Sequence, residues 1–207
     1  MTLCLVTDRR RFDPPVRGLM TQIRRAVDAG IDLIQIRERD MDAADLAALV
    51  SSAVDIAHGS LTRIIVNDRL DVAIACGASG VHLRADSFTV ADARGIAPPG
   101  FLIGRSVHGV HEAEAAADAD YLIAGAVFPT PSKPGNTTWL GGDGLRAIVR
   151  AARAPVLAIG GITVECAGQI AAAGAAGAAG IALFDTPMLT DVVASLRQQF
   201  DSARPAP

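Results

Sequence analysis

The stretch Val156-Leu157-Ala158-Ile159-Gly160-Gly161-Ile162-Thr163 carries the pattern that decides the fold of this chain of 207 residues. An apolar run without polar interruption is typical of a strand buried on both faces, as in a parallel sheet. Glycines directly after such a strand allow the backbone to approach a ligand closely. Eight such runs follow one another along the chain: Leu3–Val6, Leu33–Ile36, Ile64–Val66, Val81–Leu83, Phe101–Ile103, Tyr121–Val127, Val156–Ile159 and Ala179–Leu183.

The segments between these runs have helical periodicity and are often rich in alanine. We expect one helix over Val16–Ala29, ended by Gly30, and another over Asp42–His58, with Asp42 as its cap. Strands that alternate with helices predict βαβ units and a parallel sheet.

The number of repeats decides between two architectures. Because eight strand–helix repeats fill the chain with none missing, we predict an α/β fold, a single closed TIM (β/α)8 barrel over residues 1–207. An open, doubly wound sheet is the competing architecture. Residues 198–207 are predicted to form a flexible tail.

Composition excludes several classes of partner. The net charge of −3 argues against nucleic acid, and no apolar run is long enough to cross a membrane. Cys4, Cys76 and Cys166 lie far apart, which favours reduced thiols. The apolar start ends too early, at Asp8, for a signal peptide. We therefore expect a cytoplasmic protein; the sequence leaves its oligomeric state open, and a homo-oligomer is compatible with it.

The second strand ends in a cluster of polar residues, and the C-terminal ends of barrel strands are where active sites lie. Alternation of side chains puts Gln35, Arg37 and Arg39 on one face. The planar guanidinium suits bidentate contact with a phosphorylated ligand. An internal ion pair between Arg37 and a neighbouring carboxylate is equally compatible with this segment.

The third and fifth strands also end in groups that can carry chemistry. Asn67 and Asp68 together could hold Mg²⁺ or orient a substrate, whereas Asp68 could equally cap the following helix. Ser106 and His108 share a face, and a histidine at a strand end is a credible general base near neutral pH. The role of His82 is left open by the sequence.

A long polar loop and two glycine-rich turns complete the set of candidates. The loop runs from Phe128 to Gly142, and such loops over a barrel opening are usually lids or binding loops, although a tolerated insertion would look the same. Gly160 and Gly161 close the seventh strand, where backbone N–H groups commonly bind phosphate.

Taken together, the chain resembles the thiamine-phosphate synthase/TenI family from about Leu5 to Leu183. The matching segments occur in order at strand ends: Leu5–Asp8, Gln35–Glu38, Val66–Arg69, Gly80–Leu83, Ser106–His108, Phe128–Lys133 and Ala158–Ile162. The resemblance implies an enzyme of thiamine biosynthesis. The synthase of this family joins a pyrimidine diphosphate to a thiazole phosphate and releases pyrophosphate with Mg²⁺.

The resemblance also implies a role for each candidate. Those near the pyrophosphate would be Gln35, Arg37, Asn67, Ser106 and Lys133, with Asp68 as a metal ligand. Thr130 and Ser132 would line the thiazole phosphate side. Gly160 and Gly161 would bind the thiazole phosphate through backbone N–H groups.

The chain departs from the synthase pattern at two positions. Arg39 stands where the synthase has lysine, and Ser87 stands where it has a second metal-binding aspartate. Mg²⁺ prefers anionic oxygen ligands, so a hydroxyl is a poor replacement. Asp86, one position earlier, could serve only if the backbone shifts.

At these two positions the chain is similar to TenI-type proteins, which aromatise a carboxythiazole phosphate without metal. One histidine suffices for that proton transfer, and His108 matches its position, although synthases carry a histidine there too. We therefore expect a thiazole tautomerase without cofactor, acting on a phosphorylated thiazole. The alternative is a synthase that uses Mg²⁺ and also binds pyrimidine diphosphate. A non-catalytic regulator that binds thiazole phosphate or thiamine phosphate is the third hypothesis.

Overall fold

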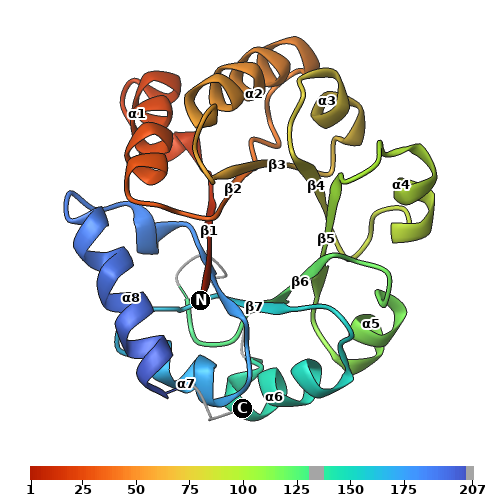
Figure 1. Cartoon of the computed structure of the whole chain (residues 1–207), viewed down its shortest axis with the longest axis vertical. Helices are drawn as coiled ribbons and strands as arrows, with labels where there is room; N and C mark the ends of the chain where they lie inside the picture. Colours follow the sequence, from red (N-terminus) through yellow and green to blue (C-terminus); the bar gives the residue numbers. More distant parts are fainter. Residues whose placement is uncertain (131–137, 204–207) are drawn as a thin grey trace.

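The computed structural model describes residues 1–130 and 138–203, and within them eight parallel strands form a closed barrel (Figure 1). Each strand pairs with its successor in the chain, and the last pairs with the first. The strands are β1 Thr2–Val6, β2 Leu33–Ile36, β3 Arg63–Asn67, β4 Gly80–Leu83, β5 Leu102–Val107, β6 Tyr121–Gly125, β7 Val156–Ile159 and β8 Gly177–Gly180. The predicted closed barrel is therefore confirmed, and the open sheet is excluded.

Helices surround the barrel as an outer ring (Figure 1). They are α1 Pro15–Asp28, α2 Ala43–Ala57, α3 Leu70–Ala75, α4 Val90–Ile96, α5 Val110–Ala115, α6 Gly141–Ala151, α7 Ala167–Ala172 and α8 Leu189–Ala203, with short 3-10 helices η1 Arg9–Arg11 and η2 Ala182–Phe184. Both helices predicted from periodicity are present. Asp42 caps α2 as expected, its carboxylate accepting a hydrogen bond of 2.9 Å from the Asp45 amide.

Several predicted boundaries are wrong. Strand β5 runs to Val107 rather than Ile103, and β6 ends at Gly125 rather than Val127. The last strand covers Gly177–Gly180 rather than Ala179–Leu183. A Cβ atom on Gly177 would lie 1.8 Å from the Thr2 carbonyl oxygen, so β8 needs minimal side chains where it approaches β1, and the larger apolar residues follow the strand. Residues 198–203 are not a tail: they continue α8, and Phe200 is fully buried.

The barrel interior is filled by its own small cluster, separate from the layer between strands and helices. Its members are Cys4, Val6, Leu33, Ile65, Tyr121, Ile123, Leu157 and Ala179. Gly104 makes room for one of them, because a Cβ there would lie 2.2 Å from Cζ of Tyr121. With the interior packed, functional polar groups gather where the strands end.

Membrane-spanning potential and thiol state can also be compared with the sequence expectations. Among the residues that the structure describes, no helix has the length and apolar character needed to span a bilayer. Cys4, Cys76 and Cys166 are free thiols. Burial raises the pKa of Cys4 to about 12, with the charge of Asp32 contributing, so this thiol stays protonated.

Candidate active site

A buried amide pair forms part of the barrel mouth, the opening at the C-terminal ends of the strands. Gln35 on β2 and Asn67 on β3 lie on the same faces of their strands as interior residues Leu33 and Ile65, so they point into the barrel. Gln35 Nε2 donates a 2.9 Å hydrogen bond to Asn67 Oδ1. Gln35 Oε1 is buried and has no partner within the described part of the chain. A bound group that donates a hydrogen bond would satisfy it.

The two residues after β2 have opposite surroundings. Glu38 is buried and accepts hydrogen bonds from Thr7 Oγ1 at 2.6 Å, from the Arg9 amide at 3.1 Å and from Arg9 Nη1 at 3.2 Å. These bonds join the end of β2 to the segment that follows β1. Glu38 is therefore part of the structural framework of the mouth.

Arg37 has no such partner. Its guanidinium is partly buried and makes no ion pair among residues 1–130 and 138–203. Burial holds its pKa below the usual value, and the positive charge of the exposed Arg39 lowers it further. Within the described residues, the internal ion pair that the sequence left open is not formed. Two arginines close together, the inner one without a carboxylate, are suited to an anionic ligand.

His82 belongs to a hydrogen-bonded chain that crosses the barrel interior. Its Nε2 lies 2.9 Å from Ser106 Oγ and its Nδ1 lies 3.2 Å from the Tyr121 hydroxyl. Complete burial lowers the pKa of His82 to about 3, with a smaller effect from the charge of Arg105. His82 is therefore neutral near pH 7, and it positions Ser106 rather than exchanging protons. The sequence signal for this role was a lone polar residue inside an apolar run.

His108 lies just beyond β5, next to the end of β6. Its side chain is exposed, and its Nδ1 contacts the carbonyl oxygen of Gly125. A carbonyl oxygen only accepts hydrogen bonds, so in the neutral ring Nδ1 carries the hydrogen and Nε2 keeps its lone pair. The backbone amide of His108 donates to Glu112 at 2.7 Å. This arrangement leaves Nε2 as the ring atom that can accept a proton.

Gly160 and Gly161 form a tight turn after β7. Their φ angles are +95° and +64°, a region that favours glycine. A Cβ on Gly160 would lie 2.6 Å from Cβ of Ala126, and one on Gly161 would lie 2.4 Å from the Pro129 carbonyl oxygen. The predicted phosphate-binding turn thus packs directly against the start of the β6–α6 loop.

Thr130 is the last described residue before a gap in that loop. The predicted substrate-binding residues Ser132 and Lys133 lie outside the described residues, as do residues 131–137 of the predicted lid. Their roles stay predictions.

Asp68 follows β3 and is surrounded by residues from the segment after β4. It has a left-handed backbone with φ of +63°. Its carboxylate accepts hydrogen bonds from Ser87 Oγ and, at 3.3 Å, from the Arg84 amide, and Arg84 Nη1 lies 3.4 Å from it. Helix α3 has no side-chain cap, so the alternative of a capping Asp68 is wrong.

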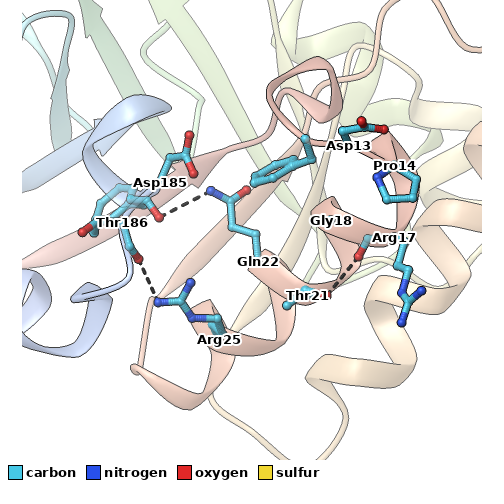
Figure 2. Close-up of a pocket in the computed structure, with 11 residues that line it drawn as sticks. Asp13, Pro14, Arg17, Gly18, Thr21, Gln22, Arg25, Asp185 and Thr186 are labelled. Carbon is cyan, nitrogen blue, oxygen red and sulfur yellow. Dashed lines mark hydrogen bonds between the residues drawn. The ribbon is translucent and has the colours of Figure 1, made fainter.

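A cleft of about 440 Å³ lies outside the barrel mouth, between α1 and the turn after η2 (Figure 2). The side chains in Figure 2 mostly bind protein atoms: Gln22 Nε2 donates to the Phe184 carbonyl at 3.4 Å, and Arg25 Nη2 donates to the Thr186 carbonyl at 2.8 Å. These bonds attach the β8–α8 turn to α1. None of the predicted site residues that the structure describes lines this cleft.

Comparison with known proteins assigns nearly the whole barrel to one family. The sequence model of the family described as thiamine monophosphate synthase matches residues 3–184. A thiamine-phosphate synthase of Methanoculleus marisnigri is 41% identical over 184 residues, which cover 87% of this chain and 87% of that protein. The chain belongs to the thiamine monophosphate synthase family.

Solved structures and longer relatives agree with this membership. A thiamine phosphate pyrophosphorylase from Pyrococcus furiosus has a TM-score of 0.83 and 32% identity, covering 98% of this chain and 96% of that one. A probable thiamine biosynthetic bifunctional enzyme of Oryza sativa is 35% identical over 94% of this chain. The match covers 36% of the rice protein, so the chain spans about a third of that relative. A 3-hexulose-6-phosphate synthase, at 18% identity and a TM-score of 0.68, shares the fold.

For a thiamine monophosphate synthase, the resemblance implies a magnesium ion on Asp68, and the residues here do not fit one. The carboxylate of Asp68 is already paired with the Arg84 guanidinium, and its other neighbour is the neutral hydroxyl of Ser87. Asp86, the possible replacement ligand, is exposed and paired with Arg84. In the described ranges, no group of three or more His, Cys, Asp or Glu residues could hold a metal ion.

The loop that carries these residues is also held in place. The guanidinium of Arg105 donates to the carbonyl oxygens of Ala85 at 2.9 Å, of Ser87 at 3.4 Å and of Phe88. Three anchored carbonyls oppose the backbone shift that would bring Asp86 to the position of a ligand. The donor set around Asp68 therefore supports no step that runs through magnesium.

Proposed function

We propose that the protein joins a pyrimidine diphosphate to a thiazole phosphate, forming thiamine phosphate and pyrophosphate. The observation that carries the proposal is the partly buried Arg37, which has no acidic partner in the part of the chain that the structure describes and follows the strand that carries Gln35 of the Gln35–Asn67 pair. The relatives named thiamine-phosphate synthase support it. The sequence had favoured the thiazole tautomerase over the synthase, and this proposal reverses that order.

In this reaction the bond between the pyrimidine methylene carbon and the diphosphate oxygen breaks. Pyrophosphate leaves with the bonding electrons, and the thiazole ring nitrogen forms the new bond to the methylene carbon with its lone pair. Negative charge grows on the leaving group, so preorganised cations such as Arg37 and Arg39 would stabilise the transition state. Backbone N–H groups at Gly160 and Gly161 would hold the thiazole phosphate.

The proposal is tested by incubating the protein with both substrates and measuring thiamine phosphate by mass spectrometry. Arg37→Gln should lower kcat/KM by about 10- to 150-fold, the loss expected for a hydrogen bond to a charged group. The matched control is Arg63→Gln, an exposed arginine at the opposite end of the barrel, which should keep full activity. Absence of thiamine phosphate with the unsubstituted protein, both with and without Mg²⁺, would refute the proposal.

A second candidate is tautomerisation of a carboxythiazole phosphate. The specific observation in its favour is His108, whose Nδ1 is bound to Gly125 while Nε2 keeps its lone pair. Nε2 would take a proton from the ring carbon and return it to the exocyclic carbon. His108→Asn should then lower kcat by about 10²–10⁴-fold with little change in substrate Kd.

Incubation with the carboxythiazole tautomer alone separates the candidates. Consumption of that compound that depends on His108, without condensation activity, would favour tautomerisation. Binding of thiazole phosphate with no turnover in either assay would favour a regulatory protein.

A further inference from the structure

We propose that Arg84 takes the place of the metal ion in this protein: held between Asp68 and Asp86, its guanidinium donates its remaining hydrogen bonds to the diphosphate group, so the reaction needs no divalent cation. The inference rests on the proposed condensation, because it assigns a hydrogen-bond donor to the leaving pyrophosphate. Its starting point is the disagreement between the metal expected at Asp68 and the residues found there.

Arg84 directly follows β4 and Arg37 directly follows β2, so the two arginines lie at the same end of the barrel, two strands apart. Asn67 is paired in register with His82, and Asp68 and Arg84 come directly after these neighbouring strand ends. The Asp68 amide donates a 2.9 Å hydrogen bond to the His82 carbonyl oxygen, which continues the pairing of β3 with β4 beyond the end of β3. Arg84 therefore follows the strand on the far side of Asn67 from β2, so Asn67 lies between the strand ends that carry Arg84 and Arg37.

The carboxylates around Arg84 hold it in place without using all its donors. Nε donates to Asp86 at 2.9 Å, Nη2 donates to the other oxygen of Asp86, and Nη1 contacts Asp68 at 3.4 Å. A guanidinium has five N–H donors, so about two remain for an oxygen of the diphosphate. The side chain is 43% exposed, so a ligand can reach it.

The same contacts oppose a metal ion. Mg²⁺ at Asp68 would have to displace a guanidinium from its oxygen, and like charges at that separation repel. Ser87 offers a neutral hydroxyl instead of the second carboxylate that the resemblance implies there, and Mg²⁺ prefers anionic oxygen ligands. Arg105 keeps the loop in this conformation through the backbone carbonyls that it binds. An arginine provides the positive charge by a permanent side chain, and it also binds phosphate in a bidentate manner.

The first experiment measures pyrophosphate binding by calorimetry in buffer with EDTA, which does not depend on turnover. The unsubstituted protein should bind inorganic pyrophosphate without added metal, and Arg84→Gln should weaken binding by about 10- to 100-fold. Arg146→Gln is the matched control: it is 42% exposed, pairs with Asp143 on the surface and should bind normally. Equal affinity of Arg84→Gln and the control would overturn the inference.

The second experiment follows Mn²⁺ by electron paramagnetic resonance. The unsubstituted protein should not bind Mn²⁺ at millimolar concentration, whereas the double variant Arg84→Gly/Ser87→Asp should bind it, and adding Asp68→Asn to the double variant should remove the site. Mn²⁺ binding by the unsubstituted protein that Asp68→Asn abolishes would overturn the inference.

Activity assays then connect the inference to the reaction. Thiamine phosphate formation should persist in EDTA, and the double variant should become dependent on Mg²⁺. Failure to form thiamine phosphate under any condition refutes the proposed function, while the two binding experiments still decide the role of Arg84. Activity that EDTA abolishes and Mg²⁺ restores refutes the role of Arg84 and leaves the proposed function intact.

Discussion

Arg37→Gln is expected to weaken pyrophosphate binding strongly while leaving the fold as stable as before, or more stable. The guanidinium is partly buried without an ion pair in the described part of the chain, and its pKa is lowered, first by burial and then by Arg39. A base whose pKa is lower in the folded than in the unfolded state destabilises the fold when it is charged. At neutral pH the substitution therefore removes an unfavourable charge.

The magnitude of the binding effect follows from the contacts that the charge would make. A hydrogen bond to a charged group contributes about 1.5–3 kcal/mol. At about 1.4 kcal/mol for each factor of ten, the loss corresponds to a 10- to 150-fold rise in Kd for pyrophosphate. Calorimetric titration in EDTA measures it directly.

The adjacent residue provides the contrast. Glu38 is buried and accepts hydrogen bonds from Thr7 and Arg9, so Glu38→Gln should destabilise the fold by about 1.5–3 kcal/mol. For a chain of this size the melting temperature should fall by about 3–12 °C. If Arg37→Gln lowers the melting temperature as much as Glu38→Gln, and pyrophosphate binding is unchanged, then the assignment of Arg37 to the ligand is wrong.

Three further outcomes follow from the site. Because burial lowers the pKa of His82 from its ordinary 6.5 to about 3 in the fold, the unfolded chain takes up a proton there first as the pH falls. The free energy of unfolding should therefore fall by up to about 1.4 kcal/mol per pH unit as the pH drops below about 6.5. His82→Gln should make this fall smaller, which urea unfolding at pH values of about 7 and about 5 measures. Gly104→Ala should cost about 1–3 kcal/mol by colliding with Tyr121, whereas Gly95→Ala, with open space around it, should not destabilise the protein in the same thermal assay. His108→Asn should leave pyrophosphate affinity in EDTA unchanged, and a large rise in Kd would place His108 at the diphosphate instead.

Local sequence patterns were sufficient for most of the fold. Strands buried between a filled interior and a layer of helices must be apolar on both faces, so they appear as continuous runs that end at turn-forming residues. Asp42 and Gly30 mark helix ends by local backbone chemistry alone. The same logic failed at β8, because its small residues are required by the approach to Thr2, which lies at the other end of the chain.

The candidate site residues were also predicted from their positions along single strands. Placing Gln35, Asn67 and Ser106 at strand ends needs only alternation and the polarity of parallel strands. Position along a strand does not reveal which of these side chains contact each other. Ser132 and Lys133 remain predictions, since they lie outside the described residues.

The barrel and the end of it that carries the polar residues could be inferred from the order of residues along the chain, and the family resemblance implied that Ser87 stands where a synthase has a metal-binding aspartate. The side-chain partners could not be inferred in this way. Three pairs meet only in the folded barrel: Gln35 with Asn67, 32 residues apart, His82 with Ser106, 24 apart, and Asp68 with Arg84, 16 apart. Such pairs depend on strand register and on loops anchored elsewhere, as Arg105 anchors the segment of Ser87. Residue types in one segment do not encode that geometry, because each partner is brought in by the packing of a different segment.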